Sequence, residues 1–125
     1  AIVSAGSKEG YSDLPVVFLN KNETTITATG LSQLKSVAQK LARHPELNIN
    51  LYGFASYDEN NCTQLSQQRS DAALRYLISN GVAVERIKIS FFGNTILRNG
   101  CTSPNCFKFL PEDNRAVVYQ LEMQW

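Results

Sequence analysis

One arginine, Arg69, stands inside a stretch whose apolar residues recur at helical spacing. At about 100° per residue, Leu65, Ala73 and Tyr76 share a helix face with Arg69. An arginine on such a face must find acceptors, because burying an unpaired guanidinium is very unfavourable. The sequence therefore predicts an anion beside Arg69. Either a ligand carboxylate is clamped there near the start of the helix, or Asp58 and backbone carbonyls of the protein itself tie the arginine down.

The side chains around this arginine do not form a catalytic set. Ser66 and Ser70 flank it, but the single histidine of the chain, His44, precedes Pro45 at the end of a different expected helix. A Ser-His-Asp arrangement is therefore not expected, and Ser66 is interpreted as a helix-start residue. The acidic residues near Arg69 suggest paired carboxylates, yet a chain of 125 residues has little room for a glycosidase cleft. We expect no enzyme.

The three cysteines are an odd number. Cys101 and Cys106 are spaced to close a small disulfide loop in an oxidising compartment, which leaves Cys62 as a buried small residue or a thiol. A zinc site is the alternative, but only His44 is present as an imidazole ligand, on a distant helix end. The sequence predicts no metal and no other cofactor.

Hydrophobic periodicity predicts the elements that hold these residues. Two-residue alternation or short β-branched runs indicate strands, and apolar residues at helical spacing indicate helices, with Thr29 or Thr27 capping the first helix and Gly81 following the second. The strands are expected at 15–19, 47–53, 84–92 and 116–123, the helices at 31–43 and 63–80, and an irregular excursion at 93–113.

This order defines an α/β fold, an α+β sandwich of the form β-α-β-α-β-β. Two strand-helix-strand units favour right-handed crossovers, with both helices packed on one face of a small mixed sheet. The other sheet face is expected to be partly open. A phenylalanine there, among Phe91, Phe92, Phe107 and Phe109, or Trp125 at the end of the chain, would mark a surface for a protein partner.

Composition limits the classes of function. With 43% hydrophobic and 18% charged residues, the chain forms one domain, 1–125, with a core of about 15–123 and a linker at 1–14 from a larger parent. Twelve basic and eleven acidic residues give a net charge of +1, which argues against nucleic acid as a partner. No apolar run reaches the roughly 18 residues needed to cross a bilayer, so this domain is not expected to insert into a membrane.

The order of several motifs resembles that of the OmpA-like, peptidoglycan-associated domain family over about 15–123, almost the whole chain. The spacing from Leu65 to Arg69 matches that family fully. The residues that carry the resemblance are Phe18, then His44-Pro45-Glu46-Leu47-Asn48-Ile49, Gly53-Phe54-Ala55-Ser56, Leu65-Ser66-Gln67-Gln68-Arg69-Ser70 and Asn114-Arg115.

The resemblance implies a ligand and a site. In that family an aspartate after the strand takes the ammonium, and an arginine on the helix takes the carboxylate, of the zwitterionic end of diaminopimelate in the peptidoglycan stem peptide. Carried over to this chain, the implied ligand-binding residues are Arg69, Asp58, Ser56, Ala55, Phe54, Leu65 and Arg115.

The sequence departs from the family pattern at the ligand loop. Ser56 stands where the family has the aspartate, Cys62 stands where it has asparagine, and the loop is about two residues shorter. A neutral hydroxyl accepts a hydrogen bond from an ammonium but adds no charge attraction, so affinity should fall unless Asp58 or Glu59 contributes. The terminal motif also differs, since an alanine follows Arg115.

Two functions remain open. The first is a non-catalytic peptidoglycan-binding module that anchors an outer-membrane protein or lipoprotein to the cell wall, at the periplasmic face of the outer membrane. The second is a degenerate OmpA-like domain that has lost wall binding and acts as a structural or protein-interaction module. An open pocket with Arg69 at its floor would favour the first, and an internally paired Arg69 the second.

Overall fold

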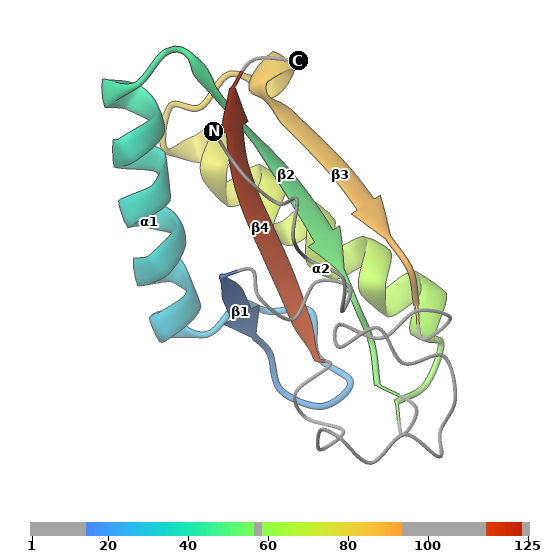
Figure 1. Ribbon diagram of the computed structural model, residues 1–125. Coiled ribbons are helices and arrows are strands. Elements are labelled where there is room, and N and C mark those ends of the chain that lie inside the picture. Colours follow the sequence, from blue (N-terminus) through green and yellow to red (C-terminus); the bar gives the residue numbers. More distant parts are fainter. Residues whose placement is uncertain (1–14, 57–58, 94–114, 124–125) are drawn as a thin grey trace.

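The computed structural model describes residues 15–56, 59–93 and 115–123. Seven elements follow one another within these residues (Figure 1), and their order confirms the predicted α/β succession of strands and helices. They are β1 (Val16–Phe18), α1 (Ala28–Arg43), β2 (Leu47–Gly53), α2 (Cys62–Ser79), the 3-10 turn η1 (Val84–Arg86), β3 (Ile87–Phe91) and β4 (Ala116–Met123).

The four strands form one mixed sheet in the order β1-β4-β2-β3. β4 lies between β1 and β2 and runs antiparallel to both, with Val17 opposite Val117 and Leu51 opposite Tyr119. β2 and β3 are parallel, as expected for strands joined by a helix. The last strand of the chain therefore enters the middle of the sheet and lies between the two strands of the first strand-helix-strand unit, β1 and β2.

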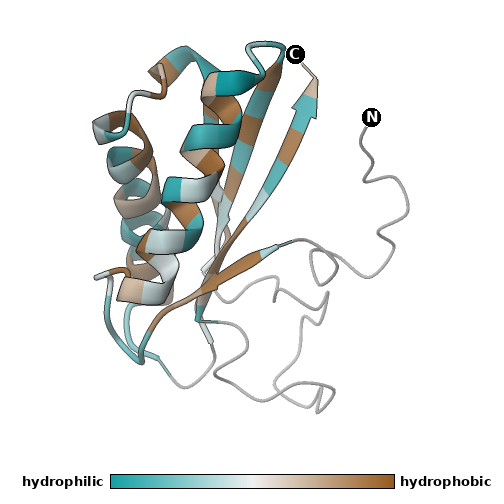
Figure 2. Ribbon diagram, turned by 90° about the vertical axis from the view of Figure 1, so that its left-hand side faces the viewer, coloured by the Kyte–Doolittle hydropathy of each residue, from teal (hydrophilic) through white to brown (hydrophobic). Residues whose placement is uncertain are grey.

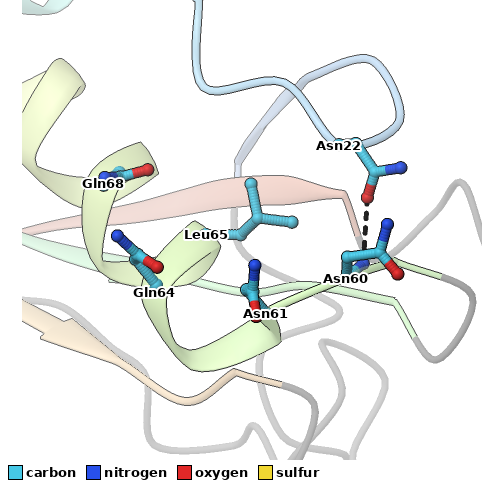
Figure 3. Close-up of a pocket in the computed structure, with 6 residues that line it drawn as sticks. All are labelled: Asn22, Asn60, Asn61, Gln64, Leu65 and Gln68. Atoms are coloured by element: carbon cyan, nitrogen blue, oxygen red, sulfur yellow. Dashed lines mark hydrogen bonds between the residues drawn. The ribbon is translucent and has the colours of Figure 1, made fainter.

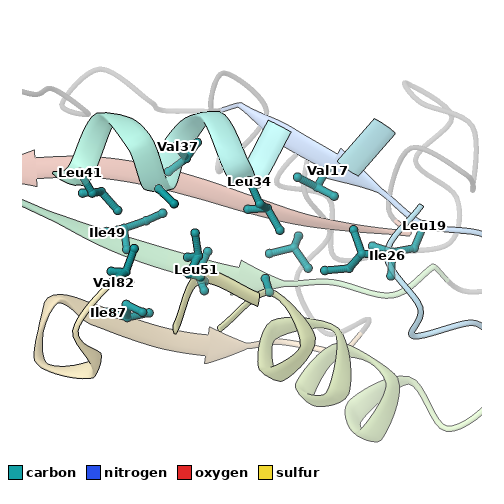
Figure 4. Close-up of a cluster of buried hydrophobic side chains, with 14 residues drawn as sticks. Val17, Leu19, Ile26, Leu34, Val37, Leu41, Ile49, Leu51, Val82 and Ile87 are labelled. Atoms are coloured by element: carbon teal, nitrogen blue, oxygen red, sulfur yellow. The ribbon is translucent and has the colours of Figure 1, made fainter. Parts of the chain in front are cut away.

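Both helices pack on the same face of the sheet (Figure 2), which confirms the predicted two-layer arrangement. Between helices and sheet lies a continuous apolar core (Figure 4). Residues alternate along a strand, so the inward positions of β2 and β4 join this core while their neighbours point to the opposite face. The core residues are Val17, Leu19, Ile26, Leu34, Val37, Ala38, Leu41, Ile49, Leu51, Ala73, Leu77, Val82, Ile87 and Val117.

Most element boundaries agree with the periodicity to within a few residues, and two of the differences have clear reasons. The first helix begins before Leu31 because Thr27, not Thr29, is its N-cap: Thr27 Oγ1 accepts a hydrogen bond from the N–H of Gly30 at 3.2 Å. The strand predicted at 84–92 begins only at Ile87, because its first residues form a 3-10 turn. The predicted excursion at 93–113 lies, apart from its first residue, outside the described residues.

A glycine sets the distance between β2 and α2. A Cβ atom added at Gly53 would lie 2.1 Å from the backbone oxygen of Ser66 and 2.3 Å from Oγ of Ser70. No side chain fits there, so the backbone of the helix rests directly on the end of the strand. This contact places Arg69 beside the residues that follow β2.

The helix-free face of the sheet is polar along its middle. Asn50 Nδ2 donates to Glu122 Oε1 at 2.7 Å, and the Tyr52 hydroxyl donates to Gln120 Oε1 at 3.3 Å. Of the aromatic residues proposed as a partner surface, Phe92 stacks with Tyr52, with ring centroids 6.3 Å apart. Phe91 is 39% exposed but alternates in phase with Ile87 and Ile89, so it belongs to the face that carries the helices. The protein partner expected on this face stays a prediction, and Phe107, Phe109 and Trp125 lie outside the described residues. No helix in the described part of the chain is long and apolar enough to span a membrane.

Candidate functional site

The guanidinium of Arg69 is completely buried and uses all five of its N–H groups within the chain. Nε donates to the backbone oxygen of Glu23 at 2.9 Å. Nη1 donates to the backbone oxygen of Phe54 at 3.0 Å and to Glu59 Oε1 at 2.9 Å. Nη2 donates to the backbone oxygen of Asn20 at 3.2 Å and to Glu59 Oε2. Arg69 therefore joins three segments of the chain around one bidentate ion pair.

The carboxylate of Glu59 is equally well surrounded. Besides Arg69, Oε1 accepts the N–H of Ser56 at 2.9 Å, and Oε2 accepts the N–H of Asn22 at 2.8 Å. Burial by itself would raise the pKa of this carboxyl group, but the hydrogen bonds from Arg69, Ser56 and Asn22 and the charge of Arg69 outweigh burial and hold the pKa below its ordinary value. Glu59 is thus a fixed anion, and the pair is electrically neutral.

The residues after β2 that the resemblance implies, Phe54, Ala55 and Ser56, lie at or next to this ion pair but are covered. Phe54, Ala55 and Ser56 are each 0% exposed. Their backbone groups anchor the end of β2, with the N–H of Phe54 bonded to Ala116 and the N–H of Ala55 bonded to Gly93, both at 2.9 Å. In this conformation, the position that the family fills with an aspartate offers no accessible side chain.

The remaining expected site residues have different positions. Leu65 is nearly buried at the start of α2 and borders a surface pocket. Arg115 is half-buried, and its backbone oxygen accepts the N–H of Leu19 at 2.7 Å, at the pairing of β1 with β4. Asp58 lies outside the described residues, so its assigned role stays a prediction.

The cysteines are only partly described. The half-buried thiol of Cys62 donates to the backbone oxygens of Ser56 and Glu59 at 3.4 and 3.3 Å, so it braces the turn that presents Glu59. Cys101 and Cys106 lie outside the described residues, and their disulfide remains a prediction.

A pocket of about 240 Å³ opens beside the buried pair (Figure 3). Asn22 and Asn60 close one side, where Asn22 Oδ1 accepts the N–H of Asn60 at 2.9 Å. Of the six lining side chains in the described part of the chain, five are carboxamides and none is charged. The lining residues are Asn22, Asn60, Asn61, Gln64, Leu65 and Gln68.

The prediction that Arg69 must find an anion and backbone carbonyls is confirmed, but the anion that the structure shows is Glu59. The sequence predicts Asp58 for the internal pairing and does not place the segment 20–23 in the site. Nothing in the polar residue types of that segment indicates that the backbone oxygens of Asn20 and Glu23 accept hydrogen bonds from Arg69.

The two-layer fold, with a buried arginine in α2, defines a class of α/β domain, and comparison gives its family. Residues 18–107 match the model of the OmpA family, so the chain belongs to that family. The peptidoglycan-associated lipoprotein of Brucella melitensis is 28% identical over 106 residues, which are 82% of this chain. The aligned region spans 60% of the length of that relative.

Solved structures of similar domains support the fold. The peptidoglycan-associated lipoprotein of Burkholderia pseudomallei superposes with a TM-score of 0.70 at 18% identity, covering 86% of this chain and 90% of that one. The C-terminal domain of Helicobacter pylori MotB gives a TM-score of 0.71 at 19% identity, covering 89% and 86%. At these identities the likeness concerns the fold alone.

Proposed function

We propose that this domain is a non-catalytic peptidoglycan-binding module that anchors an envelope protein to the cell wall. The observation that carries the proposal is the OmpA-family match across both helices, together with a pocket at the start of α2 beside the family's arginine position. The Brucella relative named as a peptidoglycan-associated lipoprotein supports the same function. A periplasmic location belongs to the proposal. Attachment to the outer membrane is part of the proposal.

The proposed binding mode is ionic: Arg69 holds a stem-peptide carboxylate, and Asp58, Ser56 and backbone amide oxygens accept hydrogen bonds from the diaminopimelate ammonium. Around them lie Phe54, Ala55, Leu65 and Arg115. The structure adds a condition for this binding mode, because the carboxylate of Glu59 already pairs with both Nη nitrogens of Arg69. The carboxylate of Glu59 is part of the same chain, so it competes with a ligand carboxylate for Arg69 at an effective concentration on the order of millimolar or more. An external carboxylate reaches Arg69 only when Glu59 leaves.

A second function is supported by the same ion pair. If the wall is not bound, the domain is a structural or protein-interaction module in which Arg69 only ties the β2–α2 connection to the segment after β1. The complete burial of Arg69 and Ser56 favours this alternative.

Co-sedimentation with purified peptidoglycan sacculi separates the two functions. If the domain binds the wall, the wild type sediments with sacculi. In NMR spectra, a diaminopimelate-containing muropeptide then shifts the backbone amides of residues 54–56 and 59–69. Absence of both effects would defeat wall binding and leave the structural alternative.

The side-chain Nε–H resonance of Arg69 then tests, without any substitution, whether Arg69 pairs directly with the ligand carboxylate. If the muropeptide carboxylate replaces Glu59, this resonance shifts during the titration, and Glu59→Gln raises the affinity because the competing charge is removed. If the resonance stays in place while backbone amides shift, the ligand binds next to the intact pair.

A further inference from the structure

The pocket beside Arg69 has an unusual chemical character for a site expected to hold a zwitterion. Among the residues that the structure describes, five carboxamides line it and no lining side chain is charged. The nearest buried charges, Glu59 and Arg69, neutralise each other and have no exposed side-chain surface. A ligand entering this pocket therefore meets hydrogen-bonding groups without net charge.

The carboxamides have hydrogen-bonding capacity to offer. Asn61 is the N-cap of α2, but its side chain makes no capping hydrogen bond. Among the contacts of the described residues, none involves the side chains of Gln64 and Gln68, and both residues are exposed. Each carboxamide presents two N–H donors and a carbonyl acceptor, which match the acceptor and donor of another amide group.

The backbone conformation at two asparagines also shapes the edge of the pocket. Asn22 and Asn61 are the two non-glycine residues with positive φ in the described part of the chain, at 59° and 51°, and both line the pocket. Asparagine tolerates this conformation better than most residues, so its presence at both points is compatible with the turn. The hydrogen bond between Asn22 and the N–H of Asn60 ties the two sides together.

We infer that this pocket binds an uncharged, amide-bearing part of peptidoglycan, either an acetamido group of the glycan or an amidated carboxyl of the stem peptide. The inference rests on the proposed wall-binding function and names its ligand class. The side chain of Leu65, in the pocket among the carboxamides, offers an apolar contact for a methyl or methylene group next to the amide. At about 240 Å³ the pocket lies below the roughly 300–1,000 Å³ of drug-sized sites, so it suits a single sugar or amino-acid residue.

Three probes distinguish the sources in NMR titrations of the whole domain: a peptide-free N-acetylated disaccharide, a stem peptide with amidated carboxyl groups, and the same peptide with free carboxylates. We expect the disaccharide or the amidated peptide to shift the amides of Asn60, Asn61, Gln64 and Gln68. The affinity of this uncharged probe for the domain should change less than about twofold between 50 and 300 mM salt, because neutral hydrogen bonds are not screened as ion pairs are. Tighter, salt-sensitive binding of the free-carboxylate peptide would overturn the inference.

Neighbouring glutamines provide matched variants. Gln64→Ala or Gln68→Ala should weaken binding about three- to tenfold, the effect of losing one hydrogen bond. Gln67→Ala, at an exposed position of the same helix that does not line the pocket, should leave the affinity within about twofold. Equal effects of Gln67→Ala and Gln68→Ala would contradict the assignment.

Sacculus co-sedimentation of the Gln64→Ala/Gln68→Ala variant separates this inference from the function on which it rests. Loss of sedimentation supports the pocket. If the double variant sediments like the wild type, the pocket assignment fails while wall binding stands. If the wild type does not sediment, wall binding fails and the pocket assignment fails with it.

Discussion

Glu59 and Arg69 form a bidentate ion pair whose two side chains are both completely buried. They lie ten positions apart in the sequence, and the pair fixes the connection between β2 and α2 to the helix that follows it. The family resemblance leads us to expect a ligand carboxylate at Arg69. In this structure Glu59 of the chain itself supplies that carboxylate. This relationship determines how the domain should respond to substitution and to acid.

Removing the arginine should be strongly destabilising. Arg69→Ala leaves the Glu59 carboxylate buried without its counter-ion, and we expect the free energy of unfolding to fall by about 3–5 kcal/mol. Urea denaturation measures the loss. Arg75→Ala on the same helix is the control, because Arg75 is exposed and its loss should change stability by less than about 0.5 kcal/mol. A small effect of Arg69→Ala would show that the pair is not formed in solution.

The same pair predicts how stability depends on pH. The pKa of Glu59 is lower in the folded protein than its unfolded value of about 4.3, so the stabilising contribution of Glu59 is fully present above that value. It is lost as the pH falls through the lower, folded-state pKa. Denaturation of wild type and Glu59→Gln at several pH values tests this, and the stability difference between them should be constant near neutrality and shrink below about pH 4. A pH-independent difference would contradict the assignment of the charge to Glu59.

The close contact of β2 and α2 predicts that Gly53 tolerates no side chain. Gly53→Ala forces the new methyl group against the backbone oxygen of Ser66, and we expect a loss of at least about 2 kcal/mol in unfolding free energy. Gly81→Ala is the comparison, because a Cβ there meets nothing within 4 Å and only the φ of 96° opposes it, at about 1 kcal/mol. If the two variants were equally stable, crowding at Gly53 would not be the cause.

The helix cap gives a smaller and separate prediction. Thr27→Ala removes the acceptor for the N–H of Gly30 and should lower the unfolding free energy by about 1 kcal/mol. Thr29→Ala is a matched control, since Thr29 lies exposed inside the first turn and is not the N-cap. Thermal unfolding followed by circular dichroism measures both, and a larger effect of Thr29→Ala would place the start of the helix elsewhere.

The fold was predictable because each element carries its own local signal. The alternation of Leu47, Ile49 and Leu51 and the helical spacing of Leu34, Val37 and Leu41 place one face of each element in the core. The strand order was not predictable in this way, because the insertion of β4 between β1 and β2 depends on pairing across some 70 residues, for which the pattern gives no register.

The site was predictable only in part. An arginine among apolar helix positions requires acceptors whatever the fold, so the burial and pairing of Arg69 could be anticipated. Its particular acceptors could not, because backbone oxygens carry no residue-type signal and those of Asn20 and Glu23 come from 49 and 46 residues away. The choice of Glu59 depends on the turn geometry that brings its N–H to the backbone oxygen of Ser56.

The glycine contact at the end of β2 also decides which part of the domain is able to move. Because backbone touches backbone at Gly53, α2 cannot slide along β2 without breaking the packed layer. Release of Glu59 from Arg69 would therefore be a local opening of the chain around Glu59, with the helix remaining in place. In hydrogen exchange, the amide of Glu59 should lose protection in such openings, while the amides in the middle of α2 stay protected until larger unfolding.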